Sequence, residues 1–233
     1  MRLLLVNGNT DAAVTARLVS AARGMTEATS EGETARFGAP YIASRAAVAV
    51  AGHAVLDALY RRLGHGNPDG FDAALIACFG EPGLDAAREA FRIPILGMAD
   101  ASIGQALAVA PRVAVLTGGP AWVPMLTEFF MLRGLGAERV MVRAVPPAGD
   151  ALARDPDAGA RLLADAARAA VAEGAGAILL GGAGLVGFDA RLAPLLPVPV
   201  LCGLRAALAA PLPPVPEGPA ADLDALLSPP RAG

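Results

Sequence analysis

The chain contains the same succession of short apolar runs, glycine turns and helix-forming segments twice. In the first half an apolar run at residues 2–7 leads through Gly8 into a helix expected to end near Gly24. In the second half an apolar run at 112–117 leads through Gly118 into a second helical segment. Strands that alternate with helices form parallel sheets with right-handed crossovers. The pattern therefore predicts an α/β protein of two pseudosymmetric domains, each a mainly parallel sheet flanked by helices.

The order of the segments also predicts the domain boundaries. We expect a first half at 1–100, a second half at 101–202, and a helix at about 203–210 that returns to the first half. Further strands are predicted at 34–38, 71–77, 92–97, 139–145, 177–182 and 198–202, and further helices at 46–63, 84–91, 158–173 and, capped by Asp100 or Ser102, up to residue 110. The Pro-rich tail at 211–233 cannot continue a helix and is expected to be loose.

Composition excludes several classes of function. The net charge of −3 gives no basic footprint for nucleic acid. The chain has no lysine, which excludes a pyridoxal-phosphate Schiff base and a Walker-A phosphate loop. Apolar runs are too short for a membrane span, and the start enters a strand instead of a signal peptide, so we expect a cytoplasmic protein without a membrane partner. No metal is expected, because His53 and His65 have no further ligands at suitable spacing.

Cys78 is the sharpest candidate for chemistry. The predicted strand at 71–77 delivers this thiol to a Gly/Pro turn, which is where open α/β sheets place their active sites. The helix that follows is expected to lower the pKa of the thiol. Gly182 stands at the corresponding place in the second half. A free cysteine is also often only a small buried hydrophobe, so both interpretations remain open on this basis.

Polar residues follow the first strand of each half. Asn9 and Thr10 come after the strand at 2–7, and Thr117 and Gly118 end its counterpart. Side-chain amides and free N–H groups at such turns bind carboxylates or enolates, although Asn and Gly also favour turns for backbone reasons alone. If the halves face one another, these turns line one cleft with the turn after Cys78.

Four segments carry a resemblance to a known family. Asn7-Gly8-Asn9-Thr10, Ala77-Cys78-Phe79-Gly80-Glu81-Pro82-Gly83-Leu84, residues 174–181 and Val198-Pro199-Val200 resemble the hydantoin racemase branch of the aspartate/glutamate racemase superfamily. The resemblance covers residues 1 to about 208. It implies an active site between two pseudosymmetric domains, no cofactor, a homo-oligomer, and two cysteines that exchange protons with opposite faces of a small-molecule substrate.

The resemblance carries over only one of the two cysteines. The first corresponds to Cys78, whereas the Gly-Cys-Ala-Gly motif of the family reads Gly181-Gly182-Ala183-Gly184 here. Cys202 is no ready substitute, because the internal repeat aligns it with Gly97. The residues expected to bind substrate are Asn9, Thr10, Tyr41, Ile42, Phe79, Gly80, Thr117, Gly118, Gly182, Ala183 and Gly184.

The predicted function is that of a cofactor-independent racemase or epimerase. It would act at the α-carbon of a small amino-acid derivative, carboxylate or hydantoin through proton transfer by Cys78. Two alternatives stay open. One is a single-cysteine lyase of the arylmalonate decarboxylase type, which keeps the opposite cysteine of the pair. The other is a non-catalytic protein that binds a small ligand in the same cleft.

Overall fold

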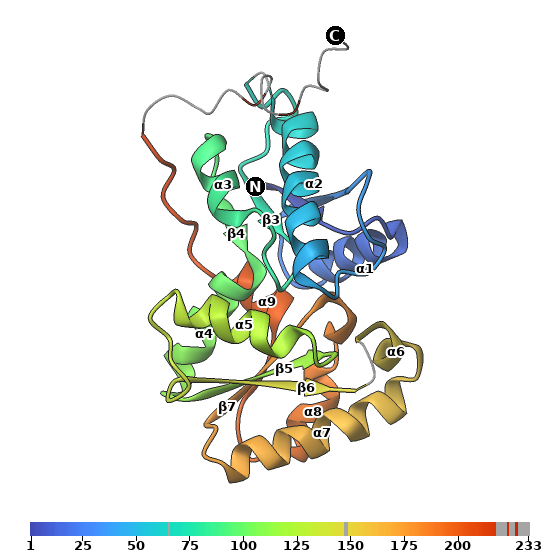
Figure 1. Ribbon diagram of the computed structural model, residues 1–233, viewed down its shortest axis with the longest axis vertical. Coiled ribbons are helices and arrows are strands. Elements are labelled where there is room, and N and C mark those ends of the chain that lie inside the picture. The colour runs from blue at the N-terminus through green and yellow to red at the C-terminus, as the bar shows by residue number, and fades with distance from the viewer. Residues whose placement is uncertain (65, 147–148, 218–222, 224–226, 228–233) are drawn as a thin grey trace.

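The computed structural model describes residues 1–64, 66–146, 149–217, 223 and 227, which form two four-stranded parallel sheets (Figure 1). The first sheet has the order β2-β1-β3-β4, with β1 at Arg2–Asn7, β2 at Thr29–Thr34, β3 at Ala73–Ile76 and β4 at Ile95–Gly97. The second has the equivalent order β6-β5-β7-β8, with β5 at Val113–Gly118, β6 at Val140–Val145, β7 at Ala177–Gly181 and β8 at Val200–Cys202. The predicted fold class is confirmed.

Helices cover both sheets and fill the space between them (Figure 1). Their bounds are Ala12–Arg23 (α1), Arg45–Leu63 (α2), Leu84–Ala90 (α3), Met98–Val109 (α4), Trp122–Met131 (α5), Gly149–Arg154 (α6), Pro156–Ala172 (α7), Asp189–Leu192 (α8) and Gly203–Leu208 (α9), with short 3-10 turns at Ala183–Leu185 (η1) and Ala193–Leu195 (η2). Asp11 caps α1 as the sequence predicts, since its carboxylate accepts from the N–H of Ala13 at 2.8 Å.

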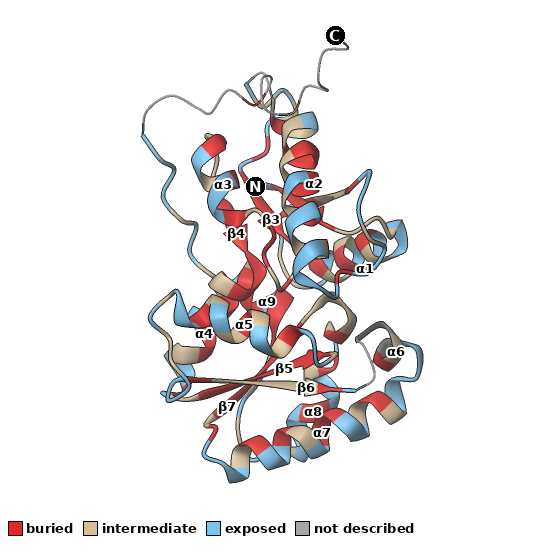
Figure 2. Ribbon diagram, in the orientation of Figure 1, coloured by how far each residue is buried: buried red, intermediate tan, exposed pale blue. Residues whose placement is uncertain are grey.

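Successive strand residues point into different cores, as period-two geometry requires. Leu5 and Val115, from the central strands of the two sheets, share one core with Met98 of α4 and Leu204 of α9. Their strand neighbours face outward, and Val6 packs with residues of α2 and α3. The central strands of both sheets are therefore buried on two faces, whereas the edge strand β6 is mainly of intermediate burial (Figure 2). The central core fixes one sheet against the other.

The strand registers of the two sheets are equivalent. The pairing of Val6 with Ile76 in the first sheet corresponds to the pairing of Leu116 with Leu180 in the second. In the same way, the pairing of Ile76 with Gly97 corresponds to that of Leu180 with Cys202. Cys78 follows Ile76 by two residues, just as Gly182 follows Leu180. By the same register Asn7 corresponds to Thr117, and Cys202 corresponds to Gly97 instead of Cys78. The internal repeat read from the sequence is thus present in the sheet topology.

Two predicted elements were wrong in position. The strand expected at 34–38 is β2 at 29–34, a polar run on the edge of the sheet. Its carboxylates pair with arginines of α2, among them Glu31 with Arg62 at 2.9 Å. Such a strand has little apolar alternation to reveal it. Helix α4 begins at Met98, directly after β4, so neither Asp100 nor Ser102 is its N-cap.

The domain boundary and the residues outside the described ranges leave several predictions untested. Helix α9 packs against α4 and α1, but the division into halves at residue 100 stays a prediction. His65 and most of the tail lie outside the described residues. Within the described ranges, no three His, Cys, Asp or Glu side chains are grouped as metal ligands would be. No described helix has both the length and the apolar character that crossing a bilayer requires.

Candidate functional site

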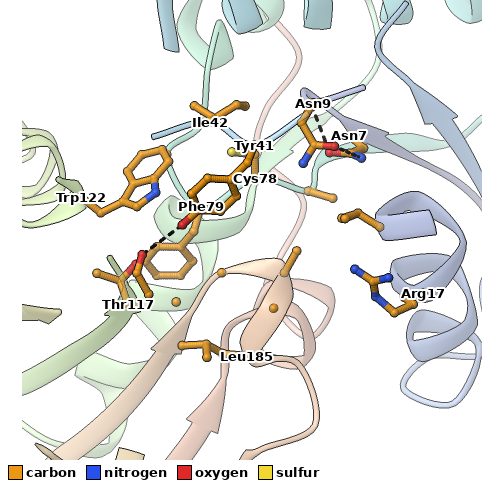
Figure 3. Close-up of a pocket in the computed structure, with 18 residues that line it drawn as sticks. Asn7, Asn9, Arg17, Tyr41, Ile42, Cys78, Phe79, Thr117, Trp122 and Leu185 are labelled. Atoms are coloured by element: carbon orange, nitrogen blue, oxygen red, sulfur yellow. Dashed lines mark hydrogen bonds between the residues drawn. The ribbon is translucent and has the colours of Figure 1, made fainter. Parts of the chain in front are cut away.

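A pocket of about 90 Å³ lies where the carboxyl ends of β1, β3, β5 and β7 meet (Figure 3). Its lining includes Cys78 and every predicted substrate-binding residue except Thr10. The strand ends of both sheets contribute to it, which is the location that parallel sheets favour for ligands. The two sheets thus bring together residues that lie more than a hundred positions apart in the chain.

The turn after β1 uses its own backbone N–H groups internally. The N–H of Asn9 donates to Asn7 Oδ1 at 3.2 Å, that of Thr10 to the carbonyl of Ala39 at 3.2 Å, and that of Asp11 to Asn9 Oδ1 at 2.9 Å. Thr10 lies outside the pocket lining. The anion clamp expected from these N–H groups is therefore not formed in this geometry.

The side-chain amide of Asn9 is the hydrogen-bond donor that this turn presents to the pocket. Its Oδ1 accepts from Asn7 Nδ2 at 2.8 Å and from the N–H of Asp11, so the amide orientation is fixed. Among described residues its Nδ2 has no acceptor, and Asn9 faces the pocket in Figure 3. The buried Asn7 also donates to Thr15 Oγ1 at 3.0 Å, which makes it the support for Asn9.

Cys78 follows the buried Ala77, the first residue after β3, and its side chain is half-buried. Burial raises the pKa of the thiol to about 11, against the opposing effect of the N–H groups of Gly80 and Glu81. The expectation of a lowered pKa was wrong. Helix α3 begins only at Leu84, so its N-terminus is too far along the chain to outweigh desolvation.

Glu81 anchors the turn after Cys78 to the start of α4. It is buried, it has a left-handed backbone with φ of 48°, and its Oε1 accepts from the N–H of Asp100 at 2.8 Å. Burial raises the pKa of this carboxyl to about 8. Glu81 supplies the acceptor that α4 lacks at its own N-cap, Gly97. Gly97 also provides the room, because a Cβ there would collide with the Glu81 carboxyl.

The same turn interlocks with the second sheet through aromatic rings and glycines. A Cβ on Gly181 would lie 2.6 Å from the Phe79 ring, and one on Gly203 would lie 3.1 Å from it. A Cβ on Gly80 would collide with the ring of Trp122. Phe79 therefore forms an apolar wall that also joins the two sheets. The tryptophan, which the sequence analysis did not select, forms the adjoining wall.

Gly182 leaves open space at the counterpart of Cys78. A Cβ on this glycine would meet no heavy atom within 4 Å, and its φ of 129° is one that side chains rarely adopt. Its carbonyl accepts from the N–H of Leu185 at 3.0 Å, which closes the η1 turn. The second half consequently presents backbone, and no proton-transferring side chain, at this position.

Three further groups complete the polar lining. The Tyr41 hydroxyl donates to the carbonyl of Gly118 at 3.3 Å, across the two halves. The hydroxyl of Thr117 and the indole N–H of Trp122 have no hydrogen-bond partner among the described residues. The Thr117 hydroxyl, the Trp122 indole N–H and Asn9 Nδ2 can therefore donate hydrogen bonds to a carbonyl or enolate oxygen of a bound ligand.

Arg17 is the functional candidate that the sequence analysis missed. It extends from α1, and its guanidinium points toward the pocket in Figure 3. No aspartate or glutamate is among the residues that line the pocket. Arg17 gives no sequence signal, since it is one of nineteen arginines and lies within an ordinary helix. Cys202, by contrast, is buried in the central core and outside the lining.

Comparison with known proteins gives consistent matches. The family profile described as Asp/Glu/Hydantoin racemase matches residues 3–210. A hydantoin racemase from Rhizobium meliloti is 40% identical over 146 residues, which cover 61% of this chain and 60% of that protein. One from Pseudomonas sp. (strain NS671) is 39% identical over 142 residues, covering 60% of this chain and 57% of that protein. The matched region thus spans about three fifths of these curated relatives.

A solved structure extends the similarity to most of the chain. The crystal structure of allantoin racemase from Pseudomonas fluorescens superposes with a TM-score of 0.81 and 30% sequence identity. The superposition covers 89% of this chain and 88% of that one. Both sheets, and so all the strand ends that line the pocket, fall within the range that the family profile matches.

Proposed function

Because the chain belongs to the Asp/Glu/hydantoin racemase family, we propose that it is an isomerase that inverts the α-carbon of a small amino-acid derivative, with hydantoin-type cyclic amides as its substrate class. The observation that carries the proposal is the single thiol of Cys78 in a pocket lined by hydrogen-bond donors and by no carboxylate. The names of the Rhizobium meliloti and Pseudomonas fluorescens proteins support a substrate of this class.

The donors stabilise the charge that develops on the substrate. Removal of a proton next to a carbonyl places negative charge on the carbonyl oxygen, and placed donors lower the cost of that charge. We assign this role to Asn9 Nδ2, the Thr117 hydroxyl and the Trp122 indole N–H. Phe79 and Ile42 supply apolar walls that exclude bulk water around the reacting carbon.

Cys78 transfers the proton on one face of the substrate. Its raised pKa of about 11 keeps the thiol protonated at neutral pH, so its resting role is that of a proton donor. On the opposite face, the open space at Gly182 admits a water molecule that removes the α-proton. The water at Gly182 releases the α-proton to solvent, and the Cys78 thiolate left after donation regains a proton from solvent. The cycle balances and requires no cofactor.

A one-thiol decarboxylase is the second candidate. It is favoured by the absence of a proton-transferring side chain at Gly182, because decarboxylation needs protonation on one face only. In that reaction a substrate with a second carboxylate on the α-carbon loses carbon dioxide, and Cys78 protonates the resulting enolate. The same donors would hold the enolate oxygen.

The two candidates separate when the protein is incubated in D2O with 5-substituted hydantoins and with substituted malonates. We expect the hydantoins to exchange the α-proton for deuterium and to lose optical activity. Release of carbon dioxide from malonates, with one labelled enantiomer as product, would contradict the isomerase and support the lyase. Binding of these compounds without exchange or release would contradict both and leave a binding protein.

A further inference from the structure

Arg17 is a cation that faces the pocket without a counter-ion. The structure shows no hydrogen bond or ion pair between Arg17 and any described residue. Arginines of the first half commonly are paired, as Arg62 is with Glu31 and with Asp69, each at 2.9 Å. Its guanidinium carries a positive charge and five N–H donors, so this end of the pocket is positive.

A second cavity of about 340 Å³ adjoins the pocket at Arg17. The two cavities share Arg17, Ala183 and Gly184, and the second is otherwise walled mainly by apolar side chains such as Leu18 and Phe188. The shared residues Ala183 and Gly184 are small, so neither places a long side chain beside the guanidinium. A substituent of a substrate bound at Cys78 can therefore extend toward Arg17.

The local charge favours an anion at this end. Neither cavity has an aspartate or glutamate in its lining. The other cation there, Arg191, already pairs with Asp157 at 2.7 Å. Helix α1 itself contains no acidic residue, and the carboxylate of its N-cap residue, Asp11, accepts from the N–H of Ala13. A single free guanidinium matches one planar carboxylate, which it binds through two parallel hydrogen bonds.

We propose that Arg17 is a specificity-determining residue that binds a carboxylate on the substituent of the substrate α-carbon. This inference rests on the proposed function and narrows its substrate class to hydantoins or related cyclic amides with a short acidic side chain. The carboxylate lies beside Arg17 and Gly184, while the α-carbon lies between Cys78 and Gly182.

Two isosteric probes test the charge directly: 5-carboxymethylhydantoin and its neutral analogue 5-carbamoylmethylhydantoin. Calorimetric titration should show that the protein binds the carboxylate at least about tenfold more tightly than the amide. Arg17→Met should bring the two affinities to near equality. Arg23→Met is the matched control, since Arg23 lies on the same helix but outside both cavities, and should keep the full preference.

Racemisation of the same two compounds distinguishes failure of this inference from failure of the proposed function. Equal affinity for both compounds in the wild type, an unchanged preference in Arg17→Met, or no binding of either compound would overturn the carboxylate subsite. In the first two of these cases, racemisation of the neutral compound would still support the isomerase. A preference for the carboxylate that Arg17→Met abolishes, without any α-proton exchange, would keep the subsite and overturn the proposed function.

Discussion

At the scale of single residues, the proposed chemistry depends on keeping a thiol neutral and accessible. Cys78 lies two residues beyond the end of β3, a strand whose side chains are all buried, and desolvation raises the pKa of its thiol to about 11. The buried Glu81 carboxyl nearby adds to that shift whenever it is ionised. A donor with this pKa suits delivery of a proton to an enolate, and it is poorly suited to act as a resting thiolate nucleophile.

The raised pKa predicts slow alkylation of Cys78. Only the thiolate reacts with iodoacetamide, so the rate at pH 8 should be far below that of the same cysteine in the unfolded chain. The rate should rise about tenfold per pH unit and level off only near pH 11. Mass spectrometry of a Cys202→Ala variant across this pH range reports on Cys78 alone. A plateau below pH 9 would contradict the raised pKa.

At the scale of elements, the turn after β3 and the end of β7 hold each other in place. The Phe79 ring occupies a space that exists because Gly181 and Gly203 have no side chains. The ring therefore connects the Cys78 turn to the strand that carries Gly182. The distance between the thiol and the open position opposite it depends on this contact.

Gly181→Ala tests the contact. Its Cβ would lie 2.6 Å from the Phe79 ring in a buried site, so we expect the free energy of unfolding to fall by about 1–3 kcal/mol. Gly104→Ala is the control, because this helical glycine of α4 has no atom within 4 Å of an added Cβ and should gain up to about 1 kcal/mol. Urea unfolding measures both. Equal changes in the two variants would show that Phe79 is not held against β7.

Most elements could be predicted from the sequence because their apolar periodicity is strong. The exceptions are set by partners distant in the chain. Strand β2 is polar and depends on pairing with β1 and on arginines of α2 such as Arg62. The start of α4 depends on the Glu81 carboxylate, which comes from a different turn. Local sequence contains neither partner, so pattern reasoning placed both elements a few residues away.

At the scale of the whole molecule, the repeat explains both what could be predicted of the site and what could not. Equivalent strand orders bring the ends of β1, β3, β5 and β7 together, so residues at those ends were found from the sequence. Arg17 and Trp122 lie on helices, and their approach to the pocket depends on how the two sheets face each other. Whether the chain forms a homo-oligomer stays a prediction.

Proton exchange by Cys78 is the central claim, and it is tested most directly by the rate of α-proton exchange in D2O. The wild type should incorporate deuterium into a 5-substituted hydantoin, and Cys78→Ala should be slower by at least about a hundredfold. Cys202→Ala, which removes the buried thiol outside the pocket, should exchange at the wild-type rate. Full exchange activity in Cys78→Ala would contradict the mechanism proposed for this site.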